Sequence, residues 1–556
     1  MQYVIGLLII LIIVVCIIGF QKQNRRKNIL TGIRNNWGEV KNDYFDFELI
    51  EMYFNTNKGE YFHKLSPQTK YDIDFNDLFC FIDRTTSKLG QQYLYNKLST
   101  PTNYIDHLKE TEKQVTFFLQ NQATRELIQT QLFKLHNNDS YFIAGLLEDN
   151  VVTKSKWSWL FIADTILMAL LLIATPIFHR CSILALILFA INLFLHFSNK
   201  NNTYKFGRSF PQLYLLIEIA KDLSKHNIPF EIKETQNSIK NLHQFQSKYS
   251  ILSFAQFTGD ELTQLLAIFL ELIKAVFLIE IHTFNSIITI IKNKKEDIAT
   301  LYSFVGSIDT AISIGSLRSG GLQYCSPEFI ASEKALSTSD IFHPLIPGCI
   351  TNSIDIHSKS ILITGSNMSG KSTFLRTIAI NSILAQTINT CFARKYKTPF
   401  FKLFSSIRIE DDLSEGKSFY MAEVNSIGNL IKETSSDSQN FYLLDEVFKG
   451  TNTVERIAAS KAILSYLNKN DNLVMVSTHD LELTELLYNE YDLYHFEEKI
   501  QEQKLVFDYL LKQGPLKSRN AIKILALSAY PPEIIEEANA ISNHIADNNL
   551  LKLKVG

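Results

Sequence analysis

The sequence predicts an α/β phosphate-loop domain at its C-terminal end, preceded by an all-α region with inserted apolar helices. Two observations predict this fold class. Residues 361–373 read as an apolar strand, a glycine-rich loop and the start of a helix, and two more apolar strands follow downstream. Upstream, residues 3–20 and 157–197 are apolar runs of membrane-spanning length, and residues 83–101 between them have helical apolar spacing.

The glycine-rich loop has the pattern G-x-x-x-x-G-K-S, which cradles nucleotide phosphates when it joins a strand to a helix. Gly365 and Gly370 allow the tight backbone path, and the loop N–H groups and the helix N-terminus face the phosphates. We expect Lys371 at the β- and γ-phosphates and the Ser372 hydroxyl on Mg²⁺. The expected nucleotide-binding residues of the loop are Gly365, Ser366, Asn367, Met368, Ser369, Gly370, Lys371, Ser372 and Thr373.

Two downstream strands end in residues suited to phosphoryl transfer. Residues 441–446 are an apolar run that ends in Asp445 and Glu446, and residues 473–477 lead to His479. We expect Asp445 to hold Mg²⁺, Glu446 to orient the attacking water and His479 to reach a γ-phosphate. Taken singly, each ending is more often a solvated turn or a structural histidine. Three such strand ends in this order favour a catalytic set of Lys371, Glu446 and His479.

With these residues identified, the chain resembles the MutS family, whose ATPase belongs to the ABC class. Residues 364–373 are similar to that family's phosphate loop, although Ser366 and Ser369 stand where Pro and Gly are usual. Residues 445–453 resemble its Walker B segment, and residues 477–480 resemble its switch-histidine segment. The similarity is dense from about 340 to 545 and includes His343, Pro344, Asn352, Arg408, Ile409, residues 411–413 and 416–423, Gly514, Ser518, Ala521, Ile522 and residues 531–535.

The resemblance implies a site that two chains share. Residues 416–423 look like the family's signature segment, in which Ser418 would be the signature serine. In ABC-class ATPases this serine acts on ATP that the other protomer binds. The resemblance therefore implies a homodimer through the ATPase heads, with ATP and Mg²⁺ bound between them. Composition and periodicity show no dimer by themselves.

Length, charge and cysteine content set broad limits. The 556 residues are enough for three or four domains with their own cores. A net charge of −2 gives no global bias toward nucleic acid or anionic lipid. The six cysteines have neither metal-binding nor disulfide-framework spacing, so a reducing compartment fits best.

The apolar run at residues 3–20 predicts a membrane anchor. Eighteen helical residues reach about 27 Å, close to the thickness of the hydrocarbon core. The run lacks a basic n-region and an A-x-A site, which disfavours a cleaved signal peptide. Residues 22–27 are rich in lysine and arginine, so we expect the side after the run to be cytoplasmic.

The second apolar block predicts a transmembrane hairpin at residues 157–198. His179 and Arg180 divide it into two arms. Lysines flank the outer ends of both arms, so we expect both outer ends on the cytoplasmic side of the membrane. Asp164 lies in the first arm. We expect it near the membrane surface, with a functional intramembrane acid as the alternative. Residues 262–291 are apolar but interrupted by charges, and predict one long buried or amphipathic helix.

Two segments around the hairpin resemble the MutS lever domain, its start at residues 83–101 and its return into the ATPase at residues 303–329. Family members that read mismatches carry an extra N-terminal domain. About fifty residues separate the first apolar run from the lever-like start, too few for that domain, so we expect it to be missing. The expected domains are an anchor (1–21), a linker (22–69), a first lever part (70–156), the hairpin (157–198), a second lever part (199–335) and the ATPase domain (336–556).

Three functions fit this organisation. The first is a membrane-anchored MutS-like ATPase of the cytoplasmic membrane, with its ATPase domain in the cytoplasm, whose dimer clamps duplex DNA in a cycle like that of mismatch repair. The second is a transporter-like ATPase. The third is a membrane scaffold that ATP switches without DNA. Three spans per chain make a thin solute pathway, and residues 408–453 resemble MutS more than transporters, which favours the first.

Overall fold

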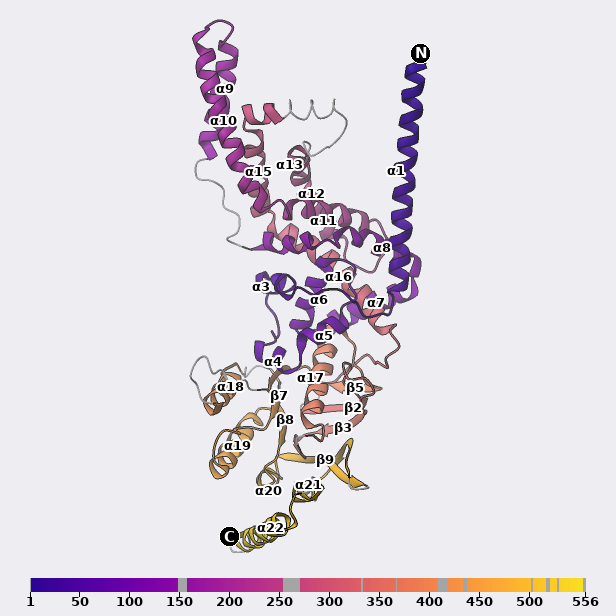
Figure 1. The fold of residues 1–556 in the computed structure, drawn as a ribbon, viewed down its shortest axis with the longest axis vertical. Helices are drawn as coiled ribbons and strands as arrows, with labels where there is room; N and C mark the ends of the chain where they lie inside the picture. Colours follow the sequence, from indigo (N-terminus) through magenta and orange to yellow (C-terminus); the bar gives the residue numbers. More distant parts are fainter. Residues whose placement is uncertain are drawn as a thin grey trace. The chain divides into compact units, whose positions relative to one another are not determined.

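The computed structural model describes residues 2–148, 158–253, 271–331, 334–366, 368–408, 419–433, 438–501, 504–516, 521–527 and 530–553. For residues 2–16, 18, 197, 199–205, 251–253, 419, 433, 499–501, 504–505, 521, 524 and 543–553 it describes the backbone alone. The chain divides into two compact units (Figure 1). Unit 1 comprises Met1–Glu60, Phe79–Ser99 and Lys109–Gly321, and unit 2 comprises Tyr61–Leu78, Thr100–Leu108 and Leu322–Gly556. Unit 2 therefore includes two short upstream segments. Residues 61–78 come from the end of the expected linker and the start of the expected lever, and residues 100–108 come from the lever.

Among its described residues, unit 1 contains helices and turns but no strand. This agrees with the all-α region expected from the sequence. Its helices are α1 (Gln2–Asn35), α2 (Phe47–Ile50), α3 (Met52–Thr56), α6 (Lys88–Ser99), α8 (Gln122–Leu132), η1 (Phe133–Leu135), η2 (Asn138–Leu147), α9 (Ser158–Ala174), α10 (Arg180–Lys205), α11 (Ser209–Leu223), α12 (Lys233–Asn241), α13 (His243–Ser253), α15 (Ile279–Asn293) and α16 (Lys295–Arg318). Helices α5 (Phe75–Ile82) and α7 (Ile105–Gln120) each begin in unit 2 and end in unit 1.

The core of unit 1 is built around α16, which packs against α6. Asp309 of α16 is fully buried and accepts hydrogen bonds from the backbone N–H groups of Thr86 (2.8 Å) and Ser87 (2.7 Å), just before α6 begins. A Cβ at Gly90 would lie 2.2 Å from this carboxylate, so only glycine fits there. Asp309 therefore fixes the turn that leads into α6, and Ser87 Oγ caps the helix by accepting the N–H of Gly90 at 2.9 Å.

Among the described residues, α16 alone is long and apolar enough to cross a membrane, and 78% of its apolar window is buried. It is a core helix of unit 1. The arms of the expected hairpin form α9, of 17 residues, and α10, of 26 residues; the apolar stretches described in them, Ser158–Ala174 and Arg180–His196, are each shorter than a membrane span. The expected first span covers residues 3–20, and the side chains of most of these residues lie outside the described part of the structure. Among the described residues, helix length thus does not support inserted transmembrane helices.

The expected single helix over residues 262–291 is wrong in its described part. Residues 271–276 are helical, a turn follows, and α15 begins at Ile279 after Leu278 adopts a left-handed φ of 48°. Two neighbouring helices bind the carbonyls that this break frees. Asn192 Nδ2 of α10 donates to Val276 O at 2.9 Å, and Thr165 Oγ1 of α9 lies 3.2 Å from Phe277 O. Residues 262–270 lie outside the described residues.

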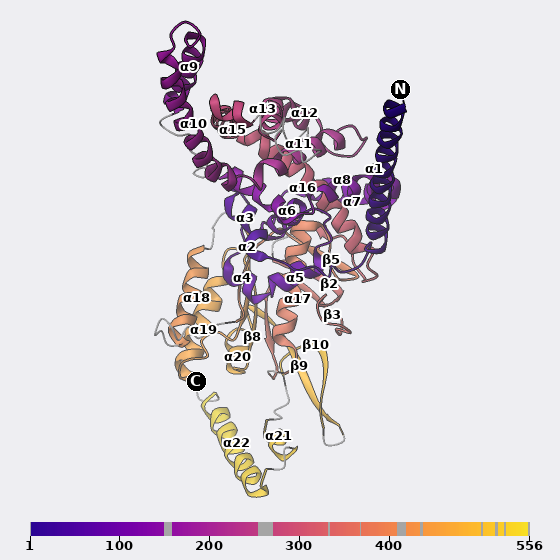
Figure 2. The ribbon, with the colours of Figure 1, turned by 45° about the horizontal axis from the view of Figure 1, so that its top comes forward.

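Unit 2 contains two sheets. Strands β1 (Glu328–Phe329), β5 (Lys395–Thr398), β2 (Ala335–Ile341) and β3 (Asn352–His357) form a four-stranded sheet in that order. The larger sheet has the order β10 (Lys504–Gln513), β9 (Tyr491–Gln501), β4 (Ser360–Thr364), β8 (Leu473–Thr478), β7 (Asn440–Asp445) and β6 (Lys402–Ser406). Strand β10 pairs antiparallel with β9, and the other five strands are parallel. Figure 2 shows β9 and β10 as a long hairpin.

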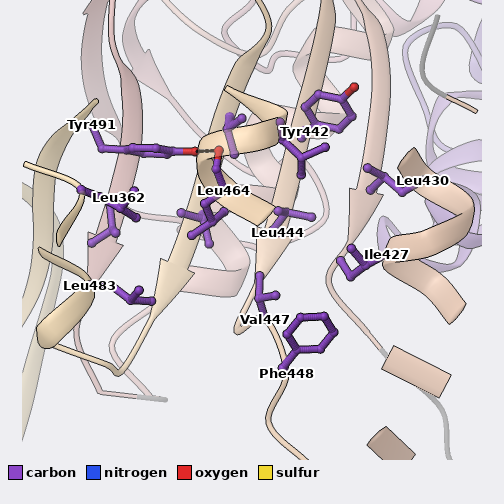
Figure 3. Packing of buried hydrophobic residues seen from close by; sticks show 14 of the residues in the cluster. Leu362, Ile427, Leu430, Tyr442, Leu444, Val447, Phe448, Leu464, Leu483 and Tyr491 are labelled. Carbon is purple, nitrogen blue, oxygen red and sulfur yellow. Dashed lines mark hydrogen bonds between the residues drawn. The ribbon is translucent and has the colours of Figure 1, made fainter. Parts of the chain in front are cut away.

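Helices cover both faces of the larger sheet. Helix α17 (Lys371–Ile388) lies on one face, and α18 (Phe419–Glu433), α19 (Thr453–Leu467) and α20 (Glu482–Leu486) lie on the other (Figures 1 and 2). Figure 3 shows the core under α19, where Leu464 meets strand residues Leu362 and Leu444 and its carbonyl accepts a hydrogen bond from the Tyr491 hydroxyl at 2.8 Å. Unit 2 also contains α4 (Pro67–Asp72), which packs on β6, and the terminal helices α21 (Ala521–Leu527) and α22 (Pro532–Leu553).

Candidate functional site

The C-terminal ends of three parallel strands bring the expected site residues together. Thr364 of β4 pairs with Thr478 of β8, and Ser477 of β8 pairs with Asp445 of β7. The strands predicted at these positions from the sequence are present. Because the loops leave these strands at one edge of the sheet, the glycine-rich loop, the two carboxylates and His479 lie next to one another.

The glycine-rich loop needs both of its glycines. Gly365 has a φ of 147°, and a Cβ there would lie 2.8 Å from Phe496 O and from Ser369 Oγ. Gly370 has a φ of 105° and immediately precedes α17. Within the loop, Ser369 Oγ donates to Ser366 O at 2.7 Å. Met368 is exposed, and Asn367 lies outside the described residues.

Lys371 is buried with its ammonium inside the loop. Its Nζ donates to the carbonyls of Gly365 (2.8 Å) and Ser366 (2.9 Å) and lies 3.3 Å from His479 Nε2. Burial lowers the pKa of Lys371 to about 8, although Asp445 and Glu446 oppose this shift. The first turn of α17 thus directs a cation into the loop, where phosphate oxygens are expected.

Asp445 and Ser372 place oxygen ligands side by side. Ser372 Oγ donates to Asp445 Oδ2 at 2.5 Å, and Ser477 Oγ donates to the other carboxylate oxygen. A hydroxyl and a carboxylate are the hard oxygen ligands that Mg²⁺ prefers. Ser366 Oγ is buried and has no hydrogen-bond partner among the described residues, which fits a loop that completes its bonds with a bound polar group.

Glu446 is held by two cationic or protonatable neighbours. Its Oε1 lies 2.8 Å from His479 Nε2, and its Oε2 lies 3.1 Å from Lys449 Nζ. Burial would raise the pKa of Glu446, but the hydrogen bond and charge of His479, helped by Lys449, outweigh it and lower the pKa to about 2. Glu446 also has a left-handed φ of 53°, a strained backbone of the kind found at functional sites.

A cavity of about 760 Å³ opens beside the glycine-rich loop. Gly370, Ser372 and Thr373 line its phosphate end, and aromatic residues including Phe342 and Tyr509 line the remainder. Asn352 supports this wall, because its Nδ2 donates to Tyr509 O (3.0 Å) and its Oδ1 accepts from Leu511 N (2.7 Å). The polar loop at one end suits the phosphates of a nucleotide, and the aromatic wall at the other end suits its base.

Sequence reasoning missed several supporting contacts. Glu423, which is fully buried in α18, accepts hydrogen bonds from the backbone N–H groups of Lys449 (2.9 Å) and Gly450 (3.1 Å). The sequence placed Glu423 at the end of the signature-like segment but gave it no role. Arg456 and Asp480 form an ion pair that joins α19 to the residue after His479, and no local pattern pointed to it. Ser418, the expected signature serine, lies outside the described residues.

The fold and this site define a P-loop nucleotide-binding domain. Residues 361–546 match the model of the family MutS domain V. The chain is 31% identical to the DNA mismatch repair protein MutS of Thermus thermophilus over 208 residues, which are 37% of this chain and 25% of that protein. It is 27% identical to MutS of Listeria monocytogenes over 319 residues, 55% of this chain and 36% of that protein.

MutS of Pseudothermotoga lettingae is 28% identical over 319 residues, 55% of this chain and 39% of that protein. The chain therefore spans between a quarter and two fifths of the length of these relatives. Their similarity and the family match agree with the geometry of the sheet edge. The C-terminal part of the chain is therefore similar in sequence to MutS domain V.

Proposed function

We propose that this protein binds ATP with Mg²⁺ and hydrolyses it, in a homodimer whose ATPase heads share the nucleotides. One observation carries the proposal: Lys371, the Ser372–Asp445 pair and Glu446 converge on one sheet edge within a MutS-family domain. Ser372 and Asp445 would hold Mg²⁺, which neutralises charge on the phosphates when bound. Ser418 would complete the site of the partner protomer.

The protein's own residues have to exchange partners for this reaction. The Lys371 ammonium leaves the carbonyls of Gly365 and Ser366 for phosphate oxygens, which are stronger acceptors. Glu446 polarises water more strongly once one of its oxygens gives up His479 or Lys449, because fewer donors then share its negative charge. A γ-phosphate would draw the His479 ring N–H and the Lys449 ammonium toward itself, so nucleotide binding would free the Glu446 carboxylate for hydrolysis.

The test measures nucleotide affinity and hydrolysis of the purified full chain, with Lys371→Ala as the binding variant. Lys371→Ala is expected to lose affinity at least tenfold. Lys359, a half-buried residue of the same unit outside the site, provides the control substitution Lys359→Ala. If the wild-type protein neither binds nor hydrolyses ATP, or if Lys371→Ala binds it as well as the wild type does, the proposal is refuted.

We further propose that the dimer clamps duplex DNA. The relatives of this chain are named DNA mismatch repair proteins, which supports the proposal. Hydrolysis is then measured with and without homoduplex and mismatched DNA across a salt series. Stimulation that weakens with rising salt supports backbone contacts to DNA. An ATP-switched scaffold would hydrolyse ATP without any response to DNA, and a transporter would respond to solute in liposomes.

We also propose that α1 and the α9–α10 hairpin lie in the cytoplasmic membrane, with the ATPase domain in the cytoplasm. The polarity of the hairpin supports this proposal. Many of its outward residues are large and apolar, such as Leu170 (59% exposed) and Phe194 (74%), whereas Asn192 and His196 are buried. A water-soluble hairpin shows the opposite arrangement, while lipid favours apolar residues outside and paired polar residues inside.

Several polar groups inside the hairpin have polar neighbours, which lowers the cost of placing them in lipid. His196 lies 3.2 Å from Glu271 and 3.3 Å from Glu280, and Asn192 and Thr165 contact the carbonyls at the broken helix. Fractionation of cells that produce the full chain tests the membrane proposal. The protein is expected in the membrane fraction after carbonate washing, and recovery in the soluble fraction would contradict the proposal.

A further inference from the structure

Arg456 and Asp480 form a two-point ion pair next to the proposed hydrolytic residues. Arg456 Nε donates to Asp480 Oδ2 at 2.9 Å, and Nη2 donates to Oδ1 at 2.6 Å. Both side chains are largely buried, with 23% and 14% exposed. A paired guanidinium–carboxylate contact fixes orientation as well as distance, because two parallel hydrogen bonds resist rotation.

The ion pair restrains the position of His479, which precedes Asp480 in the chain. The backbone N–H of Asp480 donates to Thr478 Oγ1 at 3.0 Å, and its carbonyl accepts from Leu483 N at 3.2 Å. Hydrogen bonds therefore hold the main chain of Asp480, while Arg456 holds its side chain. His479 lies between this fixed residue and the end of β8, and its ring reaches Glu446 at 2.8 Å.

Helix α19 also contacts the chain next to Glu446, on the opposite side of the Glu446–His479 contact. Ser460 Oγ donates to the carbonyl of Val447, the residue after Glu446, at 3.1 Å. The helix begins at Thr453, where Asn452 caps it by accepting the N–H of Glu455 at 3.0 Å. One helix therefore sets the distance between Glu446 and His479 from both sides. Glu446, His479, Lys449 and Arg456 line a small cavity of about 230 Å³.

We propose that Arg456 is a positioning residue for ATP hydrolysis, which acts through Asp480 to hold His479 in place relative to Glu446. The inference rests on the proposed ATPase function. Arg456 itself stays on Asp480 and does not touch the nucleotide. Its loss leaves the phosphate loop intact and loosens the histidine, so turnover suffers while ATP binding persists.

The test compares kcat and KM of Arg456→Ala, Arg456→Lys, Asp480→Asn and the double variant Arg456→Ala/Asp480→Asn. We expect kcat to fall about 10- to 100-fold in both single variants, with KM within about threefold of the wild-type value. Arg456→Lys is expected to recover part of kcat, because lysine keeps one of the two contacts. The double variant is expected to be no slower than the slower single variant, since the two residues act as one unit.

Lys461→Ala is the matched control, because Lys461 lies on the same helix and pairs with Glu490 at 3.4 Å outside the site. This variant is expected to keep wild-type kcat and KM. Wild-type kcat in Arg456→Ala, a change confined to KM, or multiplicative losses in the double variant would overturn the proposal. Loss of kcat in Arg456→Ala with wild-type kcat in Asp480→Asn would also overturn it, because Arg456 would then act directly.

A second measurement separates this inference from the proposed ATPase function. In histidine-labelled protein without nucleotide, the ring N–H signal of His479, assigned with His479→Gln, reports the contact with Glu446. Arg456→Ala is expected to shift or broaden this signal and Lys461→Ala to leave it unchanged. An unchanged signal in Arg456→Ala refutes the positioning role. A shifted signal in a protein that does not hydrolyse ATP refutes only the proposed function.

Discussion

Arg408 and Asp74, 334 residues apart in the chain, form a bidentate ion pair in which Arg408 Nη2 lies 2.8 Å from Asp74 Oδ2 and Nη1 contacts the second oxygen. Arg376 of α17 lies 3.8 Å from the same carboxylate. Gln68 Nε2 also donates to the carbonyl of Arg408 at 2.7 Å. A short upstream segment thereby fixes the last described residue before the expected signature segment.

Asp72 is the buried centre of this contact. Its carboxylate accepts hydrogen bonds from Ser405 Oγ (2.6 Å) and from the N–H groups of Ile407 (3.0 Å) and Arg408 (2.8 Å). Asp72→Ala is expected to destabilise unit 2 by roughly 3 kcal/mol, because buried donors lose their acceptor. Hydrogen exchange of the β6 amides or thermal unfolding measures the loss. Arg394→Ala, which breaks the exposed pair with Asp340, is the control and is expected to cost under about 0.5 kcal/mol. Equal losses in the two variants would contradict a structural role of this contact.

Glu446→Gln is expected to bind ATP but not hydrolyse it, and so to trap the nucleotide-bound dimer. Glutamine keeps the size of the side chain but loses the charge that polarises water and attracts Lys449. Turnover is expected to fall at least about 100-fold, while light scattering with ATP shows a stable dimer. Glu490→Gln, away from the site, is the control. Wild-type turnover in Glu446→Gln would remove Glu446 from the mechanism.

ATP affinity is expected to depend on pH through Lys371. Burial lowers its pKa to about 8 in the free protein, and a bound phosphate favours the ammonium, which raises the pKa again. Above about pH 8, binding therefore takes up a proton, and affinity falls by up to about tenfold per pH unit. Below about pH 7 the residue is charged in both states and contributes no pH dependence.

Titration calorimetry in buffers of different ionisation enthalpy measures this proton uptake directly. Lys371→Arg is the control, because arginine stays charged throughout the range and should abolish the slope above about pH 8. A wild-type affinity that stays constant from about pH 7 to 9.5 would contradict a depressed pKa for Lys371.

A lysine on the outward face of the hairpin distinguishes lipid from water around it. Leu170 lies in α9 with 59% of its side chain exposed. If lipid surrounds α9, Leu170→Lys costs about 2–4 kcal/mol of insertion and reduces the membrane-bound fraction. If water surrounds it, the same change improves solubility. Tyr44→Lys, at an 87% exposed position of unit 1, is the control and is expected to leave membrane recovery unchanged.

The sequence alone determined the phosphate loop, the strands that flank it and the residues at their ends. Those signals are local: an apolar run, a glycine pattern and a helix start need only a few neighbouring residues. Once the strands are parallel, their C-terminal ends meet, which is why Lys371, Asp445 and His479 converge as expected.

Only the tertiary structure decided which ordinary side chains support that site. The contacts of Asp74 with Arg408, of Arg456 with Asp480 and of Glu423 with the backbone at Lys449 join residues that no sequence period relates. The break before α15 escaped prediction for the same reason, because polar side chains of other helices bind the freed carbonyls. A residue's type and spacing reveal its local conformation, whereas its partners depend on how distant segments pack.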